Sequence, residues 1–256
     1  MTTYKGIQGF TVQSLASDPS PLVTGQLWYN SGSNVWKVGI PAAGAWSSGG
    51  DVNNGRNQCA GAGRTSSAAI VMGGRTFPPA TPYSSKIVES YDGTTWTVAT
   101  DMTLERGYFN GVGTQTAALV TLAQGTAPPS AIITNTETYN GTGWTEVGDA
   151  VTPRSNAIGS GTTSACIYAG GATSTNPGSM VGNAEDYDGT SWTEVTDLNT
   201  ARWKLGASIA GTPSATLVFA GSLAGPPWTN NIVEEWNGTS WAVETALGTA
   251  RYGPGG

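Results

Sequence analysis

The chain has 256 residues and a formal net charge of −6, with 37 glycines, 14 prolines and only 11% charged residues. This composition is typical of short strands joined by tight turns, and the length is sufficient for one all-β domain with a substantial core. The acidic balance argues against binding to nucleic acid or to anionic membranes, because both need a basic surface.

The N-terminal residues contain no basic region followed by an apolar core, and no later stretch approaches eighteen consecutive apolar residues. We therefore expect neither a secretory signal nor insertion into a membrane. Two prolines within residues 17–24 disfavour helix and central strand alike. Residues 1–24 are thus predicted to form an extended N-terminal arm, which lies on the domain or reaches a partner.

From residue 25 the chain becomes strand-like, and a single domain is predicted over residues 25–256. Leu27–Asn30 and Asn34–Val38 are strand-like segments separated by Ser31-Gly-Ser33, a pattern that predicts a β-hairpin. A further short strand is predicted around Trp46, where the repeating part of the sequence begins.

A tryptophan followed ten residues later by an arginine occurs five times in the chain. Successive tryptophans lie 50, 48, 48 and 49 residues apart, and a fixed period of this length is typical of propellers and arrays. The tryptophans are interpreted as core residues that pack between the repeats. A large ring that recurs at one structural position indicates packing more strongly than ligand recognition. The five pairs are Trp46 and Arg56, Trp96 and Arg106, Trp144 and Arg154, Trp192 and Arg202, and Trp241 and Arg251.

Each complete repeat contains four strand signals. In the first repeat, residues 58–63, 67–74, 87–91 and 95–98 have strand composition, and Asp92-Gly93 predicts a tight turn between the last two. Three further repeats follow the same plan. Antiparallel units of four strands with an apolar second strand predict blades that bury their faces against one another.

The first and last segments of the predicted domain are expected to form one more blade together. Arg251–Gly256 matches only the start of a repeat, whereas residues 25–48 supply roughly three strands that end at the repeat tryptophan. Joining one C-terminal strand to three N-terminal strands predicts a fifth, composite blade. The expected fold is therefore an all-β, five-bladed β-propeller, whose closure removes an exposed sheet edge.

The repeats resemble the Kelch repeat, which has two glycines after the second strand, then a tyrosine, and a tryptophan five residues later. The first and third repeats carry these residues as Gly73-Gly74, Tyr91 and Trp96, and as Gly170-Gly171, Tyr187 and Trp192. The second and fourth repeats depart from the pattern, with Ala123-Gln124-Gly125 in the one and Ala220-Gly221 and Trp236 in the other. The resemblance covers about residues 46–256 and implies a propeller.

A narrower resemblance is to Kelch-like virion proteins of tailed phages that infect aquatic bacteria. It rests on Tyr-Asp-Gly-Thr-Ser-Trp-Thr-Glu and Asn-Thr-Ala-Arg in the repeats, and on Gly25-Gln-Leu-Trp-Tyr-Asn-Ser31 after Ser17-Asp-Pro-Ser20. This resemblance implies a virion protein of the tail, a fibre or the capsid surface. It also implies contacts with other virion proteins through the N-terminal arm or one propeller face.

Several classes of catalytic site are excluded by residues or motifs that the sequence lacks. The chain has no histidine, which excludes His-based triads, His–metal sites and the copper site of galactose-oxidase-type Kelch enzymes. Cys59 and Cys166 fall in different repeats at different strand positions, so we predict two buried free thiols without a disulfide or a zinc site. The sequence lacks a nucleotide-binding fingerprint, and we expect neither a cofactor nor a metal.

Carboxylates leave one catalytic alternative, a glycan-cleaving enzyme, because some five-bladed propellers hydrolyse glycans with acids around the central channel. A glutamate recurs seven residues before the tryptophan of each complete repeat, as Glu89, Glu137, Glu185 and Glu234. A residue that recurs in every complete blade favours a structural role.

The recurring arginines have two interpretations. They form partly buried ion pairs, or hydrogen bonds to carbonyl groups, that lock neighbouring blades together. Alternatively, they form a cationic ring at the channel mouth for an acidic sugar or a phosphate. Regular repetition favours the first interpretation.

Non-repeated side chains are the better candidates for ligand binding. The connections between second and third strands differ in every repeat, and alternating strand directions place them on one face with the arginine-bearing connections. Phe77, Tyr83, Trp228 and Arg75 belong to these connections, where aromatic rings stack on a sugar or dock a protein; packing of the loops against the blades is the alternative. We therefore predict a non-enzymatic virion protein, a decoration or host-recognition module that binds a host surface glycan or a protein through this face.

Overall fold

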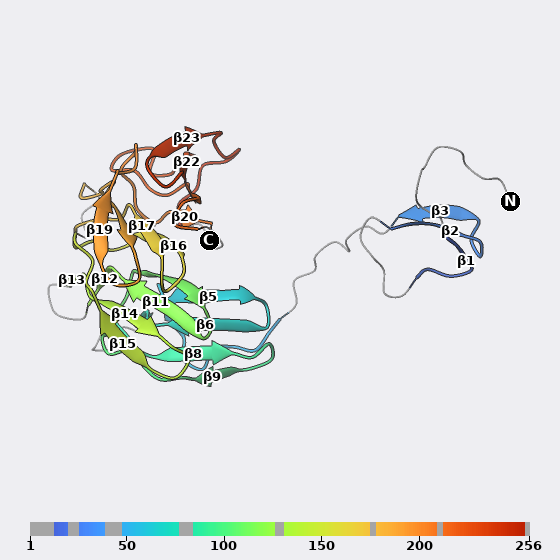
Figure 1. Ribbon diagram of the computed structural model, residues 1–256, viewed down its shortest axis with the longest axis horizontal. Coiled ribbons are helices and arrows are strands. Elements are labelled where there is room, and N and C mark those ends of the chain that lie inside the picture. Colours follow the sequence, from blue (N-terminus) through green and yellow to red (C-terminus); the bar gives the residue numbers. More distant parts are fainter. Residues whose placement is uncertain are drawn as a thin grey trace. The chain divides into compact units, whose positions relative to one another are not determined.

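The computed structural model describes residues 13–19, 26–38, 48–76, 84–125, 131–174, 178–208 and 212–253. These residues form 23 strands and no helix, and thus contain no helix that could cross a membrane. The all-β class predicted from the sequence is confirmed. The chain divides into two compact units, Met1–Ser48 and Gly49–Gly256, which are described separately (Figure 1).

The second unit contains four sheets, called sheets I to IV, each with four antiparallel strands in up-and-down order. Sheet I consists of β5 (Ala60–Thr65), β6 (Ala68–Met72), β8 (Val88–Tyr91) and β9 (Trp96–Val98), and sheet II of β10 (Asn110–Thr114), β11 (Ala117–Thr121), β14 (Thr136–Tyr139) and β15 (Trp144–Val147). Sheet III consists of β16 (Ile158–Gly161), β17 (Cys166–Ala169), β18 (Ala184–Tyr187) and β19 (Trp192–Val195), and sheet IV of β20 (Gly206–Ala207), β21 (Thr216–Phe219), β22 (Val233–Trp236) and β23 (Trp241–Glu244). Two shorter sheets pair β4 (Arg56–Asn57) with β7 (Arg75–Thr76), and β12 (Ala123–Gln124) with β13 (Ile132–Ile133).

The turn between third and fourth strands explains the recurring Asp-Gly or Asn-Gly pair. Gly93 has a φ of +96°, which glycine adopts without steric cost, and Asp92 Oδ1 accepts hydrogen bonds from the N–H groups two and three residues later, both at 2.8 Å. The turn sets Tyr91 opposite Trp96, with ring centroids 5.0 Å apart. Equivalent ring pairs occur in sheets II, III and IV.

Apolar side chains fill the spaces between successive sheets. Three buried clusters join sheet I to II, II to III, and III to IV. In β11, Leu119 belongs to the cluster shared with sheet III, and its neighbour Val120 belongs to the cluster shared with sheet I. β11 is mostly apolar because both of its faces pack against neighbouring sheets.

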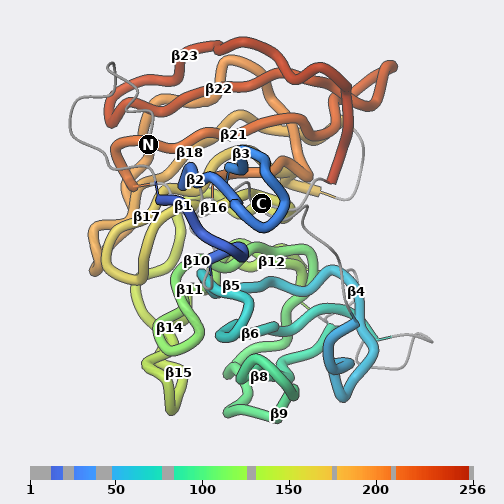
Figure 2. The backbone as a smooth tube through the Cα atoms, turned by 90° about the vertical axis from the view of Figure 1, so that its right-hand side faces the viewer, coloured from blue at the N-terminus to red at the C-terminus, as the bar shows by residue number. Residues whose placement is uncertain are grey.

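The first strands of the sheets lie side by side. β5 contacts β10, β10 contacts β16, and β16 contacts β20. Figure 2 shows β9, β15 and β23 at the edge of the second unit, and β5, β10 and β16 nearer its middle. The sheets therefore follow one another with their first strands inward, although none of the sheets in the described residues closes on itself.

The diglycine position is displaced in the second repeat. The first residue of this position has a φ of +54° at Gly73, +66° at Gly170 and +57° at Ala220, and the matching residue of the second repeat is Leu122, with a φ of +52°. The sequence-based placement at Ala123-Gln124-Gly125 is therefore wrong by one residue. It failed because the left-handed backbone is retained where no glycine marks it.

The first unit is a three-stranded sheet in which β2 (Leu27–Asn30) lies between β1 (Gln13–Leu15) and β3 (Val35–Val38). β2 and β3 form the predicted hairpin, and β1 is parallel to β2. The Asp18 carboxylate stabilises this arrangement through an ion pair with Lys37 at 2.8 Å. The hydrogen bond from Lys37 lowers the pKa of Asp18.

This sheet bears on two expectations from the sequence, the extended N-terminal arm and the composite fifth blade. β1 lies within residues 1–24, where an extended arm was expected, and Asn30 of β2 donates a hydrogen bond to Asp18 at 2.7 Å, which ties the arm to the hairpin. The hairpin forms its sheet with β1. The composite fifth blade is therefore not confirmed.

Candidate functional site

Four of the five repeat arginines form buried ion pairs with the repeat glutamates of the third strands. The nitrogen–oxygen distances are 2.5 Å for Arg56 and Glu89 and 2.8 Å for Arg106 with Glu137 and Arg202 with Glu234, and Arg154 pairs with Glu185. All eight side chains are at most 1% exposed. These guanidinium groups therefore present no cationic ring to solvent. The fifth arginine, Arg251, is exposed.

The same glutamates accept hydrogen bonds from the backbone of the preceding connection. Glu137 Oε2 accepts one from the Thr103 N–H at 2.7 Å, and Oε1 accepts one from the Leu104 N–H at 3.3 Å. The other three glutamates accept equivalent bonds. Carboxylates that are buried and hydrogen-bonded in this way are not available to a substrate or to a catalytic water.

Acid pH is expected to weaken this network at Glu89. Burial raises the pKa of Glu89, but hydrogen bonds from the Asn53 N–H and from Arg56 outweigh it and lower the pKa from 4.5 to about 2. The carboxylate therefore contributes stability that is present above pH 4.5 and is lost as the pH falls towards 2, on the order of 3 kcal/mol. Thermal melts of the wild type and of Glu89→Gln measure this loss; an equal pH slope in both proteins would contradict it.

The residue twelve positions after each repeat tryptophan has a left-handed backbone conformation. The φ is +54° at Gln58, +58° at Tyr108, +55° at Asn156, +52° at Lys204 and +59° at Gly253. For residues other than glycine this conformation costs about 1–2 kcal/mol, so surrounding contacts must hold it. From Tyr108 onward, the N–H of each of these residues donates to the carbonyl oxygen of the residue at this position in the preceding repeat, at 3.3, 2.8, 3.2 and 2.9 Å in chain order. These five residues are called the axial set.

The axial set lines one cavity of about 410 Å³, called the axial cavity. The five repeats thus bring one backbone position to the same place with different side chains, which are two amides, a phenol, an ammonium group and the hydrogen of glycine. Apolar neighbours, among them Phe109 and Leu205, also line the cavity. The backbone at this position is therefore shared by the five repeats, whereas the side chains differ.

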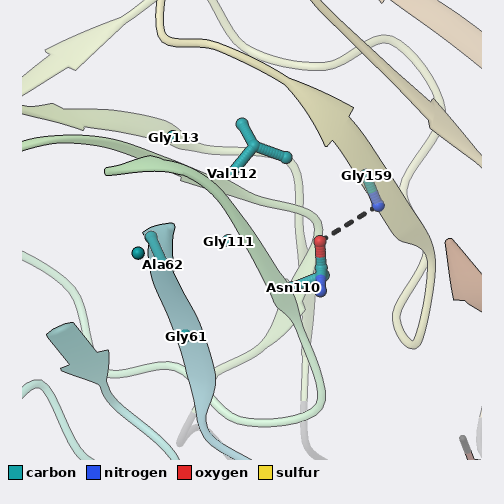
Figure 3. A pocket seen from close by; sticks show the side chains of 8 residues that line it. Gly61, Ala62, Asn110, Gly111, Val112, Gly113 and Gly159 are labelled. Carbon is teal, nitrogen blue, oxygen red and sulfur yellow. Dashed lines mark hydrogen bonds between the residues drawn. The ribbon is translucent and has the colours of Figure 1, made fainter. Parts of the chain in front are cut away.

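A second cavity of about 250 Å³ adjoins the axial cavity, and Asn110 lines both. Figure 3 shows that small residues of the first strands, such as Gly61, Gly111 and Gly159, surround it. Asn110 Oδ1 accepts a hydrogen bond from the Gly159 N–H at 3.1 Å and so joins β10 to β16 (Figure 3). No carboxylate lines either cavity among the residues that the structure describes, and these residues contain no cluster suited to a metal ion.

Cationic groups and aromatic rings meet at the axial cavity. Lys204 Nζ lies 4.8 Å from the ring centroid of Trp203 and 5.9 Å from that of Tyr252, within the range of cation–π attraction. Arg75 lies over the Tyr108 ring at 5.2 Å, and one of its nitrogens donates to the Tyr108 hydroxyl at 2.7 Å. Within the described ranges Lys204 forms no salt bridge. The cavity therefore combines positive charge with ring surface.

The predicted ligand residues are only partly placed by the structure. Arg75 lies beside the axial cavity through its contact with Tyr108. Trp228 is 50% exposed in the connection between β21 and β22 and does not line this cavity. Phe77 and Tyr83 lie outside the described residues.

The repeat tryptophans begin the fourth strand of each sheet, at Trp96, Trp144, Trp192 and Trp241. Trp192 and Trp241 are buried and the other two are half-buried, whereas Trp46 lies outside the described residues. Both cysteines are free; Cys166 is buried, but Cys59 is only half-buried because it lines the open axial cavity.

The axial set was not predicted from the sequence. One feature of the sequence marks these residues. They stand at a fixed offset from the repeat tryptophan, and the residue type there changes in every repeat. The left-handed backbone that defines the position leaves no trace in the side chains of Gln58, Tyr108 and Lys204, because these residue types do not favour it.

Comparison with protein-family models and with curated proteins finds no match to this chain. The resemblances to Kelch repeats and to phage virion proteins therefore stay predictions from sequence motifs. The function of the chain is therefore inferred from the geometry of the axial cavity and of the first unit.

Proposed function

We propose that the chain is a non-enzymatic binding module of a virion, in which a five-bladed propeller of Kelch type recognises a glycan or a protein at its loop face. The observation that carries the proposal is the axial set, because five equivalent residues with five different side chains line one cavity. The virion context, as a decoration or host-recognition module, is supported by the motif resemblance of the repeats and of the segment after Ser17.

The start of the fifth repeat supports a ring of five blades. The Gly171 N–H donates to the Arg202 carbonyl oxygen at 2.9 Å, and the Gly221 N–H donates to that of Arg251 at 3.1 Å. Arg251 thus has the backbone contact of a repeat arginine, and Gly253 continues the axial set. The strands that complete the fifth blade, expected from the N- and C-terminal segments, stay a prediction.

Binding is favoured over cleavage by the chemistry of the cavity. Its described lining offers amides, a phenol and an ammonium group but no carboxylate, whereas a glycosidase needs an acid and a base or nucleophile near the scissile bond. The repeat glutamates are buried against arginines. The described carboxylates therefore give the glycan-cleaving alternative no support.

The first unit suits attachment to other virion proteins. Tyr29 and Trp36 are cross-strand neighbours with ring centroids 5.4 Å apart. Leu27 and Val38 are paired on the same face, and Leu27, Trp36 and Val38 are 45%, 58% and 51% exposed. Because an apolar face this exposed favours contact with a partner, we assign anchoring to the first unit and recognition to the second.

The proposed function is tested by attachment of the full chain to host cells and to an array of surface glycans. Tyr108→Asn is expected to weaken attachment about tenfold, because it removes a ring from the cavity while asparagine tolerates the left-handed backbone. A thermal melt checks the fold. Trp36→Ala, in the first unit, is the control and is expected to attach like the wild type. Unchanged attachment of a folded Tyr108→Asn variant would remove the axial cavity as the site.

A further inference from the structure

We infer that the axial cavity binds an acidic sugar, and that Lys204 is the contact for the sugar carboxylate. The inference rests on the proposed binding function and names the ligand class for it. The proposed function leaves the chemistry of the ligand open. The cavity specifies it through one charged contact, polar neighbours and aromatic rings.

The charge distribution at the cavity favours an anionic ligand. Lys204 is the one charged side chain among the described lining residues. Its ammonium group lies over two aromatic rings and forms no salt bridge within the described part of the chain. A ligand carboxylate at this point meets no competing acid, although the chain as a whole carries a net charge of −6. A local cation on an acidic protein selects where an anion binds.

The neutral groups of the cavity suit the rest of a sugar. Gln58 and Asn156 bring amides, which donate to and accept from hydroxyl groups. Asn110 uses its oxygen to accept from Gly159, and its amide nitrogen has no hydrogen-bond partner among the described residues. The Tyr252 ring is 59% exposed and offers a flat surface to the C–H face of a pyranose. The volume of about 410 Å³ lies within the usual range of small-ligand sites.

A carboxylate fits this site better than a phosphate monoester, which carries nearly two negative charges. Phosphate sites typically contain either an arginine that binds in a bidentate manner or several free backbone N–H groups. Here the repeat arginines of sheets I to IV are held in buried ion pairs, and the N–H groups of the axial set from Tyr108 to Gly253 donate to carbonyl oxygens. The one charged group among the lining residues is therefore the ammonium group of Lys204, which matches one singly charged anion.

The test is calorimetric titration of the full chain with a uronic-acid oligosaccharide and with its carboxyl-reduced, neutral counterpart. Wild type is expected to bind the acidic form about tenfold or more tightly than the neutral form, because a hydrogen bond to a charged group is lost. Lys204→Met is expected to remove this preference, so that the acidic and neutral forms bind with equal affinity. Lys204→Arg retains the charge and is expected to retain the preference.

Lys86→Met is the matched control, because it removes the same charge from an exposed lysine that does not line the axial cavity. It is expected to bind like the wild type. Equal affinity of wild type for the acidic and neutral forms would overturn the inference and leave glycan binding intact. Tighter binding of a sulfated neutral oligosaccharide than of the uronate, or binding of neither form, would also overturn it. Cell attachment by Tyr108→Asn decides the proposed function separately.

Discussion

Replacing Trp192 by alanine is expected to lower the free energy of unfolding by about 3–5 kcal/mol. The indole is 7% exposed and packs against Tyr168 and Tyr187, with ring centroids 5.6 and 4.9 Å away. Its N–H donates to the Thr136 hydroxyl of sheet II at 3.1 Å. Truncation therefore leaves a cavity between sheets II and III and removes a hydrogen bond between them. Urea denaturation measures the loss.

Trp228→Ala is the control for this prediction, since it deletes the same side chain from a connection instead of from the core. Trp228 is 50% exposed, and its removal is expected to cost less than about 1 kcal/mol. If both variants lost stability equally, the repeat tryptophan would not be the wedge between sheets that its packing indicates.

Replacing Arg106 by methionine in the otherwise wild-type chain is also expected to lower the free energy of unfolding by about 3–5 kcal/mol. Arg106 donates to Glu137 from Nε at 3.2 Å and from Nη2 at 2.8 Å, and to the Asn135 carbonyl oxygen at 2.6 Å. Both charged side chains are fully buried. Methionine fills a similar space but leaves the Glu137 carboxylate without its counter-ion, which is why the cost exceeds that of a surface pair.

The double variant Arg106→Met, Glu137→Gln separates charge from packing. It is expected to be more stable than Arg106→Met alone, because an amide replaces the uncompensated buried charge. Urea denaturation of the two single variants and the double variant gives the coupling energy. Additive losses would show that the pair contributes only as separate side chains and would contradict the buried ion pair.

The axial cavity illustrates a limit of sequence reasoning. Phe77, Tyr83 and Trp228 were expected to form the site because they interrupt the repeat on exposed connections. Tyr108 and Lys204 stand inside the repeat at a fixed offset from its tryptophan, and neither residue type favours the left-handed backbone that it adopts. The residue types themselves therefore did not distinguish these positions from ordinary strand residues.

The sequence by itself determined the four main strands of each complete repeat, the tight turns and the period of the repeat. A turn such as Asp92-Gly93 is specified locally, because the aspartate bonds to the next N–H groups and glycine adopts the positive φ. Only the tertiary structure decided which side chains meet at the axial cavity. The backbone of Lys204 is held by the carbonyl oxygen of Asn156, one repeat earlier in the chain. Residues so far apart come together only when the sheets between them pack face to face and bury the clusters they share.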